Sequence, residues 1–408
     1  MKCRHCGNEL NLTFLDLGTA PPSNAYLAKD DLKKPEVWFP LKLLVCDKCW
    51  LVQTEDYANR EQLFTSDYAY FSSTSKSWLD HAKNYVEGIS SRLKIDKHSH
   101  VVEIASNDGY LLQYFKQRNI PCLGIEPTKS TAEAARQKGI EVVEEFFGVA
   151  LAKRLKENEK LADLIIGNNV LAHVPDINDF VSGVAELLKP QGTVTFEFPH
   201  LVRMIEGLQF DTVYHEHFSY LSFTTVKQIL TEQGLKIYDV EELETHGGSL
   251  RVYAQLEKTG RNEETQNVKR LLNKEEHLGV MSEEYYQGFQ EKVMKVKHDF
   301  LSFLLEAKEL GKRVIGYGAA AKGNTLLNFA GVTTDLIEFV CDAAPSKQNK
   351  YMPGSRLPIL KPEFLEECRP DIVFIFPWNI STEIKKQLLS SVGQYTKFYI
   401  GIPSIMEL

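Results

Sequence analysis

The 408-residue sequence predicts an α/β protein in which a small N-terminal metal-binding module precedes two doubly wound, Rossmann-like units. Three observations support this fold class. Two Cys-x-x-Cys pairs lie in a turn-rich N-terminal stretch, apolar strands alternate with helical segments from about residue 72 to 256, and the alternation resumes after a charged segment at 258–297. A chain of this length exceeds a single hydrophobic core. We therefore expect three units, at 1–70, 71–256 and 257–408.

The N-terminal module contains four cysteines in two close pairs: Cys3, Cys6, Cys46 and Cys49. Four thiolates in two knuckles close a tetrahedral Zn²⁺ site and leave no open position for a substrate. Redox-active or merely buried cysteines are the alternative, and His5 or Asp47 offers a replacement ligand. Because the set of four cysteines is complete, the sequence predicts a structural zinc that stabilises a module too small to fold alone.

The expected strands of the two larger units follow a regular order along the chain. In the middle unit they lie within 99–115, 120–127, 139–147, 160–174 and 187–199. In the C-terminal unit they lie within 311–329, 335–348, 369–379 and 397–403. Short apolar runs followed by helical patterns are typical of parallel strands. The charged segment between the units has helical spacing and predicts one long, solvent-exposed connecting helix.

The first strand of the middle unit runs into a small polar turn that resembles the S-adenosylmethionine motif of class I methyltransferases. Glu103 lies inside the strand and Gly109 ends the turn. In that class, this arrangement holds the amino-acid end of S-adenosylmethionine. The usual pattern is E-x-G-x-G-x-G, and here Ala105 and Asn107 replace two of its glycines.

Further candidate cofactor contacts lie at the ends of the following strands. Glu126 and Pro127 end the strand at 120–127, where a carboxylate can accept charge-assisted hydrogen bonds from two ribose hydroxyls. The remaining candidates, near adenine and the methyl donor in that class, are Glu145, Phe146, Asn168 and Asn169. Ordinary strand-end chemistry is the alternative for each residue. A nicotinamide cofactor is the competing ligand, and the missing glycines count against it.

Residues 211–220, D-T-V-Y-H-E-H-F-S-Y, concentrate titratable side chains in a short segment. A His-x-His pair on an extended segment points both rings one way and can bind a metal. Alternatively, a set of His, Glu and Tyr side chains serves proton transfer. An ordinary surface loop is the third possibility.

Five segments together resemble the three-domain sugar C-methyltransferases of branched deoxysugar biosynthesis, such as the C-3 methyltransferases acting on 4-keto-2,6-dideoxy nucleotide sugars. These segments are the Cys-x-x-Cys module, VEIASNDG, YHEHFSY, THGGSLRVY and GYGAAAKGN, and they span nearly the whole chain. The resemblance implies a general base at His217. It also implies active-site roles for Tyr68, His173, Tyr214 and Glu216.

The residue types fit methylation of carbon. A C–H next to a ketone can be deprotonated to an enolate, which then attacks the electrophilic methyl group of S-adenosylmethionine. Histidine suits the base because its pKa lies near neutrality, and a Tyr hydroxyl or second imidazole can stabilise the developing oxyanion. We therefore expect His217 to be the base, with His173 or Tyr214 as the oxyanion partner and Glu216 orienting an imidazole.

The C-terminal unit contains the run G-Y-G-A-A-A at 316–321, which fits a dinucleotide fingerprint, and Asp342 ends the next strand. Alone, this pattern predicts an NAD site and a fused oxidoreductase. The resemblance implies instead that the unit holds the nucleotide-sugar, with a Gly-rich turn and a lysine suited to a diphosphate. The candidate substrate contacts are Gly318, Lys322, Asn324, Lys347 and Arg251. An ordinary solvated lysine at 347 and a simple tight turn at 247–251 are the alternatives.

The composition limits the class of partner. A formal net charge of −8 and a pI near 5.8 argue against nucleic acid or an anionic membrane. Without an apolar N-terminal signal or a bilayer-long apolar stretch, we expect a cytoplasmic protein acting on a small nucleotide-sugar. The sequence leaves the oligomeric state open. A sugar O- or N-methyltransferase is the nearest alternative, whereas an RNA methyltransferase or a zinc-ribbon binding protein is less favoured because the chain is acidic.

Overall fold

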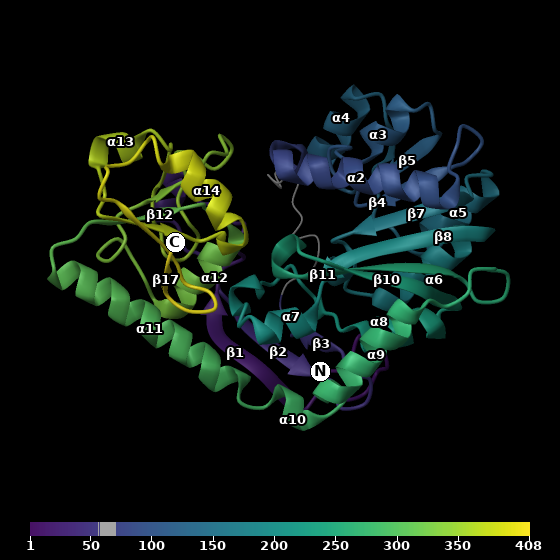
Figure 1. The fold of residues 1–408 in the computed structure, drawn as a ribbon, viewed down its shortest axis with the longest axis horizontal. Helices are drawn as coiled ribbons and strands as arrows, with labels where there is room; N and C mark the ends of the chain where they lie inside the picture. Colours follow the sequence, from purple (N-terminus) through teal and green to yellow (C-terminus); the bar gives the residue numbers. More distant parts are fainter. Residues whose placement is uncertain (56, 58–70) are drawn as a thin grey trace.

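The computed structural model describes residues 1–55, 57 and 71–408, which form three sheets (Figure 1). The middle and C-terminal units form two α/β lobes (Figure 1). The N-terminal strands and helix α11 (Phe289–Glu309) run beneath and between the lobes (Figure 1). The predicted class, a small cysteine-rich module followed by two Rossmann-like α/β units, is confirmed.

The N-terminal sheet is antiparallel, with the order β1-β2-β3-β9. Its strands are β1 (Leu12–Ala20), β2 (Phe39–Val45), β3 (Val52–Thr54) and β9 (Ser219–Tyr220). The last strand comes from the middle unit, where Tyr220 pairs with Val52. Phe14 on β1 stacks on Phe289 of α11 with ring centroids 4.7 Å apart. The small module therefore completes its sheet and its core with residues of the other units.

The middle sheet has seven strands in the order β10-β11-β8-β7-β4-β5-β6. Neighbours among β4, β5, β6, β7 and β8 are parallel, whereas β10 and β11 form an antiparallel edge. The strands are β4 (Val101–Ile104), β5 (Cys122–Ile125), β6 (Glu141–Val143), β7 (Ala162–Asn168), β8 (Leu188–Pro199), β10 (Leu235–Leu243) and β11 (Ser249–Leu256). The order reverses between β4 and β7, and ligands of open α/β sheets bind beyond the carboxyl ends of the strands at such a point.

Helices pack on both sides of the middle sheet (Figure 1). They are α2 (Lys76–Leu93), α3 (Leu112–Gln117), α4 (Lys129–Gln137), α5 (Val149–Glu157), α6 (Ile177–Leu187) and α8 (Phe223–Glu232). Helix α7 (Leu201–Glu206) follows β8 and packs into the core of the N-terminal sheet. Short 3₁₀ turns η3 (Leu171–His173), η4 (Phe210–Thr212) and η5 (Thr245–Gly247) lie between these elements. The central strand β4 is buried along its whole length, which explains why three of its four residues are apolar.

The connecting segment differs from the single exposed helix that we expected. It forms α9 (Gln266–Leu278), α10 (Glu283–Tyr286) and α11, with Gly279 and Gly288 in the left-handed region at the two breaks. Glu275 on α9 is fully buried and accepts hydrogen bonds from His200 and from the start of α8. Among the helices within the described ranges, none is long and apolar enough to cross a membrane.

The C-terminal sheet has six strands in the order β14-β13-β12-β15-β16-β17, parallel except for β17. The strands are β12 (Val314–Tyr317), β13 (Val340–Cys341), β14 (Ile359–Leu360), β15 (Ile372–Ile375), β16 (Lys397–Ile400) and β17 (Met406–Glu407). The helical elements are α12 (Ala321–Ala330), α13 (Phe364–Cys368), η6 (Trp378–Ile380) and α14 (Ser381–Leu388). The start of α12 and the turn η6 face the middle unit.

Candidate active site

A cavity of about 500 Å³ opens at the carboxyl ends of β4, β5 and β7, where the strand order of the middle sheet reverses. All three units contribute to its wall. Asn24 comes from the N-terminal module, Glu126 and His217 from the middle unit, and Lys322 and Asn379 from the C-terminal unit. The cavity therefore depends on how the three units meet.

The turn after β4 adopts a glycine-like backbone although two of the usual glycines are absent. Ala105, Asn107 and Gly109 have positive φ angles of 58°, 48° and 75°. This conformation costs a non-glycine residue roughly 1–2 kcal/mol, and Asn tolerates it better than Ala. The Asn107 N–H donates to Glu126 Oε2 (2.9 Å), and the Asn107 side-chain oxygen accepts from the Ser72 N–H (2.9 Å). These contacts hold the turn in the shape that the glycine pattern provides elsewhere.

Two candidate cofactor residues lie beneath the cavity wall. Glu103 is 1% exposed, and burial together with the nearby Asp108 carboxyl raises its pKa well above the ordinary value. Gly109 packs against Ile140 so closely that a Cβ would not fit. Glu103 and Gly109 therefore support the turn from below.

The other candidate cofactor residues lie together on the cavity wall: Ala105, Asn107, Glu126, Pro127, Glu145, Phe146, Asn168 and Asn169. The two oxygens of Glu126 accept hydrogen bonds from the N–H groups of Asn107 and Thr128, both at 2.9 Å. Each carboxylate oxygen keeps a second lone pair for a ribose hydroxyl. Phe146 adds an aromatic ring to this wall, so the residues present fit an adenosine ligand.

The candidate catalytic residues converge on the same cavity, which Tyr214, Glu216, His217 and His173 all line. The His217 ring centroid lies 4.3 Å from that of Tyr214 and 4.5 Å from that of His173. His173 follows β7, so it stands next to the cofactor wall. Tyr68, the fifth catalytic candidate, lies outside the described residues.

The protonation of the two imidazoles follows from their partners and their burial. His173 Nδ1 lies 2.9 Å from the backbone oxygen of Glu216. Because a carbonyl oxygen only accepts, Nδ1 carries the proton of the neutral ring and Nε2 presents a lone pair. Burial lowers the pKa of His173 to about 4; burial, followed by the neighbouring His173, lowers the pKa of His217 well below its ordinary value. Both rings are therefore neutral at pH 7, and their lowered pKa values make each a weaker base than a free imidazole.

Asn24 is a site residue that the sequence did not reveal. Its Nδ2 donates to both carboxylate oxygens of Glu216, at 3.0 Å each, and it lines the cavity. It lies in the T-A-P-P-S-N loop of the N-terminal module, which looked like an ordinary turn. The zinc module thereby orients a carboxylate of residues 211–220, which we call the catalytic segment.

His246 is a second residue that we did not single out. It lines the cavity from η5, and its Nε2 lies 3.4 Å from Asn169 Nδ2. Burial lowers its pKa to about 4. The T-H-G-G motif was part of the family resemblance, and a histidine before two glycines was the available signal.

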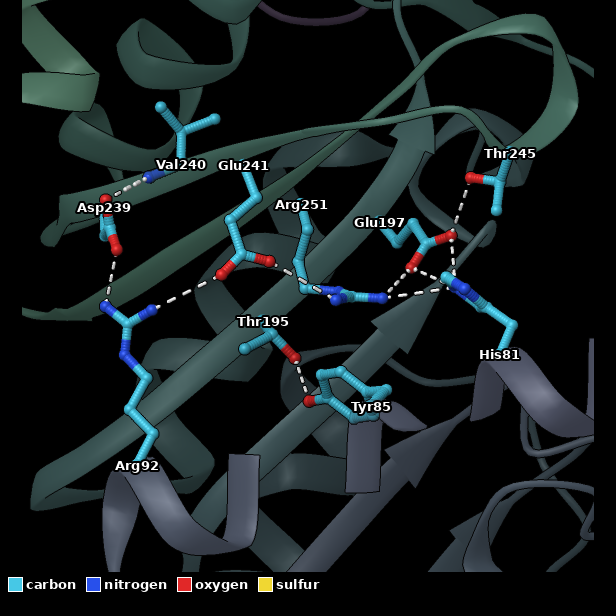
Figure 2. A network of polar contacts seen from close by, with 10 residues as sticks. All are labelled: His81, Tyr85, Arg92, Thr195, Glu197, Asp239, Val240, Glu241, Thr245 and Arg251. Carbon is cyan, nitrogen blue, oxygen red and sulfur yellow. Dashed lines mark hydrogen bonds and ion pairs between the residues drawn. The ribbon is translucent and has the colours of Figure 1, made fainter. Parts of the chain in front are cut away.

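A buried ion pair fixes the loop that carries His246 (Figure 2). Arg251 Nη2 lies 2.6 Å from Glu197 Oε2, and His81 Nε2 lies 3.0 Å from both Glu197 oxygens. Thr245 also donates to Glu197, at 3.1 Å. Arg251, a candidate substrate contact, is thus 6% exposed, paired within this network and not part of the cavity wall.

The remaining candidate substrate contacts divide into two groups. Lys322 and Lys347 line the cavity. Gly318 is packed against the Pro377 ring, where a Cβ would lie 2.5 Å away, and Asn324 donates to the Ser23 backbone oxygen at 2.6 Å. Gly318 therefore packs within the C-terminal unit, whereas Asn324 joins that unit to the N-terminal module, and neither residue lines the cavity.

The four cysteines of the N-terminal module form one cluster, in which all Sγ atoms lie within 4.8 Å of one another. The Sγ separations are 3.5 Å for Cys3 with Cys49 and 3.5 Å for Cys6 with Cys46. Zn–S bonds of about 2.3 Å place tetrahedral thiolates slightly farther apart, so the set fits Zn²⁺. His5 is held elsewhere, by Asn178 at 2.9 Å.

We expect Cys46→Ser to remove the bound zinc, lower the unfolding temperature and abolish methyl transfer. One ligand is lost, and the module that holds Glu216 loses its metal. Metal analysis of the purified chain and thermal unfolding measure the effect. Cys368→Ser, outside the cluster, is the matched control and should retain one zinc per chain. A Cys46→Ser protein with wild-type zinc content would contradict the assignment.

We expect Glu126→Gln to weaken S-adenosylmethionine binding by about 10- to 100-fold, because the amide loses charge-assisted hydrogen bonds to the ribose. Isothermal titration calorimetry gives the dissociation constant. Glu144→Gln is the control, since Glu144 pairs with Arg136 at 3.0 Å away from the cavity wall. Unchanged affinity in a folded Glu126→Gln protein would exclude the ribose contact.

Comparison with known proteins bears on the whole chain. Family models match residues 3–64 as a zinc binding domain, 78–240 as a methyltransferase domain and 244–403 as a C-methyltransferase C-terminal domain. The chain is 32% identical to C-methyltransferase NovU of Streptomyces niveus over 405 residues, which cover 98% of this chain and 95% of that protein.

Two solved structures are similar to part of the chain. The PH0226 protein of Pyrococcus horikoshii OT3 is 14% identical, with a TM-score of 0.39 over 49% of this chain and 100% of its own. Magnesium protoporphyrin IX methyltransferase of Synechocystis PCC 6803, solved with bound SAH, is 13% identical, with a TM-score of 0.35 over 43% of this chain and 82% of its own.

The family models follow one another in the order of the three sheets, and the relationship to NovU extends over nearly the full length of both chains. The chain therefore belongs to the three-domain C-methyltransferase family and is an S-adenosylmethionine-dependent C-methyltransferase with a zinc-binding N-terminal module.

Proposed function

We propose that this enzyme methylates the carbon next to the ketone of a nucleotide-linked 4-keto (deoxy)sugar, at C-3. The observation that carries the proposal is the pair of buried, neutral imidazoles, His173 and His217, beside the cofactor wall. Methylation of an alcohol or amine needs no acidified C–H, whereas carbon methylation requires a base to remove one. The motif resemblance supports the sugar as substrate.

His217 takes the proton from the α-carbon, and the electron pair moves onto the keto oxygen as an enolate. S-adenosylmethionine supplies the electrophilic methyl group that the enolate carbon attacks, and S-adenosylhomocysteine leaves. His173 presents a lone pair on Nε2 and cannot donate from that atom while neutral. This favours the Tyr214 hydroxyl, next to His217, as the donor that stabilises the enolate oxygen.

The nucleotide diphosphate lies against the C-terminal unit. Lys322 and Lys347 place two cationic side chains on that side of the cavity, which suits an anionic ligand. The alternative of an NAD site requires Asp342 to bind a ribose. However, Asp342 is absent from the cavity wall, and its two oxygens accept hydrogen bonds from the N–H groups of Ala319 and Ala344 at 2.7 Å each.

The test of this function is incubation with labelled S-adenosylmethionine and a panel of 4-keto nucleotide sugars, followed by NMR location of the new methyl group. We expect His217→Asn to abolish both methylation and solvent-deuterium exchange at the α-carbon. His215→Asn is the matched control, because His215 bonds the Pro40 oxygen at 3.1 Å and lies off the cavity wall. Unchanged exchange would remove His217 from the role of base, and a methyl group on oxygen would overturn carbon methylation.

KM for the nucleotide-sugar should also depend on pH. Burial lowers the pKa of Lys322 to about 8, so its ammonium is charged below about pH 8 and is lost above it. We therefore expect KM for the nucleotide-sugar to rise as pH increases through 8, with S-adenosylmethionine affinity unchanged. Lys322→Met should raise KM throughout and remove this dependence. A wild-type KM that stays constant from pH 7 to 9 would contradict the contact.

A further inference from the structure

Trp378 lies where the C-terminal unit meets the catalytic segment, and neither the sequence patterns nor the proposed mechanism gives it a role. It begins η6, directly after Pro377, which lines the cavity. Its indole Nε1–H donates to Asp211 Oδ2 at 2.7 Å. Asp211 is 1% exposed and opens the segment that leads to Tyr214 and His217.

The Trp378 ring also contacts two other motifs. Its edge packs against Gly247, which has a φ of 89° and no room for a Cβ because of this ring. Lys322 Nζ lies 4.2 Å from the ring centroid and donates to Asn379 Oδ1 at 2.8 Å. The Trp378 ring and the Asn379 amide thus hold the Lys322 ammonium group, which we propose binds the substrate.

The charge of Lys322 depends on the ionisation of neighbouring groups. Among the described residues, the titratable groups near it are Asp211, His217 and His246, of which Asp211 raises its pKa. Burial raises the pKa of Asp211 to about 6, and the Lys322 ammonium and then the Trp378 indole N–H oppose this rise. The hydrogen bond from Trp378 therefore favours an ionised Asp211, which in turn favours a charged Lys322.

We propose that Trp378 is a positioning residue for substrate binding: it sets the Lys322 ammonium on the cavity wall through its ring, through Asn379 and through its hydrogen bond to Asp211. Through Gly247 and Asp211 it also ties the C-terminal unit to the His246 loop and the catalytic segment. The proposal rests on the proposed function, because it assumes that Lys322 meets the anionic part of the substrate.

Two substitutions separate the ring from the hydrogen bond. Trp378→Phe keeps an aromatic face for Lys322 and loses the N–H, whereas Trp378→Leu loses both. We expect KM for the 4-keto nucleotide-sugar to rise about tenfold in the first and more in the second, with kcat within about threefold of wild type. S-adenosylmethionine affinity should not change. Trp38→Phe, at an exposed site, is the matched control and should leave this KM unchanged.

The pH profile gives a readout that a merely structural role would not move. In Trp378→Phe the Asp211 carboxyl loses the indole donor, so its ionised form is less favoured. The pKa of Lys322 then falls, and the rise of KM should begin at a lower pH than in wild type. Asp211→Asn should shift the profile in the same direction, and the double variant should show less than the sum of the two effects because both act through one contact. Asp211→Asn also serves as the test if Trp378→Phe does not fold.

The pKa of Lys322 can be measured without any substrate, by NMR of the chain labelled at its lysine side chains. A lower Lys322 pKa in Trp378→Phe supports the proposal even where every 4-keto nucleotide-sugar fails as a substrate of wild type, which would overturn the proposed function alone. A Lys322 pKa and a KM both equal to wild type in Trp378→Phe and Asp211→Asn would overturn the positioning role.

Discussion

The catalytic segment finds hydrogen-bond partners for its buried backbone in all three units, and the site depends on this constraint. An unpaired buried carbonyl costs about as much as a lost hydrogen bond. Thr54 of the N-terminal module bonds the backbone oxygens of His217 and Phe218, both at 3.2 Å. Thr325 of the C-terminal unit bonds the Val213 oxygen at 2.8 Å. The units are therefore joined at the residues that we propose for the chemistry.

The same constraint determines what the imidazoles can do. The Glu216 backbone oxygen accepts a hydrogen bond from His173 Nδ1, which leaves Nε2 of the neutral ring as an acceptor. Burial also disfavours the charged form of each ring. A base that is already neutral needs no deprotonation before it acts. The packing that satisfies the backbone thus keeps both rings neutral, as the proposed role of His217 as a base requires, and also lowers their basicity.

Features carried by local patterns were predictable, whereas contacts between distant loops were not. The cysteine cluster and the alternating strands depend on short-range spacing, and Glu126 on its place at a strand end. Asn24 reaches Glu216 across 192 positions, and Trp378 reaches Asp211 across 167, without any periodic signal. Arg251 was expected among the substrate contacts as part of the segment at 247–251, but it is paired with Glu197 within the sheet.

The zinc site explains how so small a module can serve the catalytic segment. Its strand β3 has three residues and receives the two-residue strand β9, so this pairing contributes little stability by itself. The metal closes the loops beside β3, at Cys46 and Cys49, and fixes the strand that Thr54 ends. The Asn24 loop is anchored separately, since the Tyr26 hydroxyl donates to the Ala319 oxygen at 2.6 Å. Zinc bound at the four cysteines would therefore stabilise the backbone of the catalytic segment, through the strand that ends at Thr54.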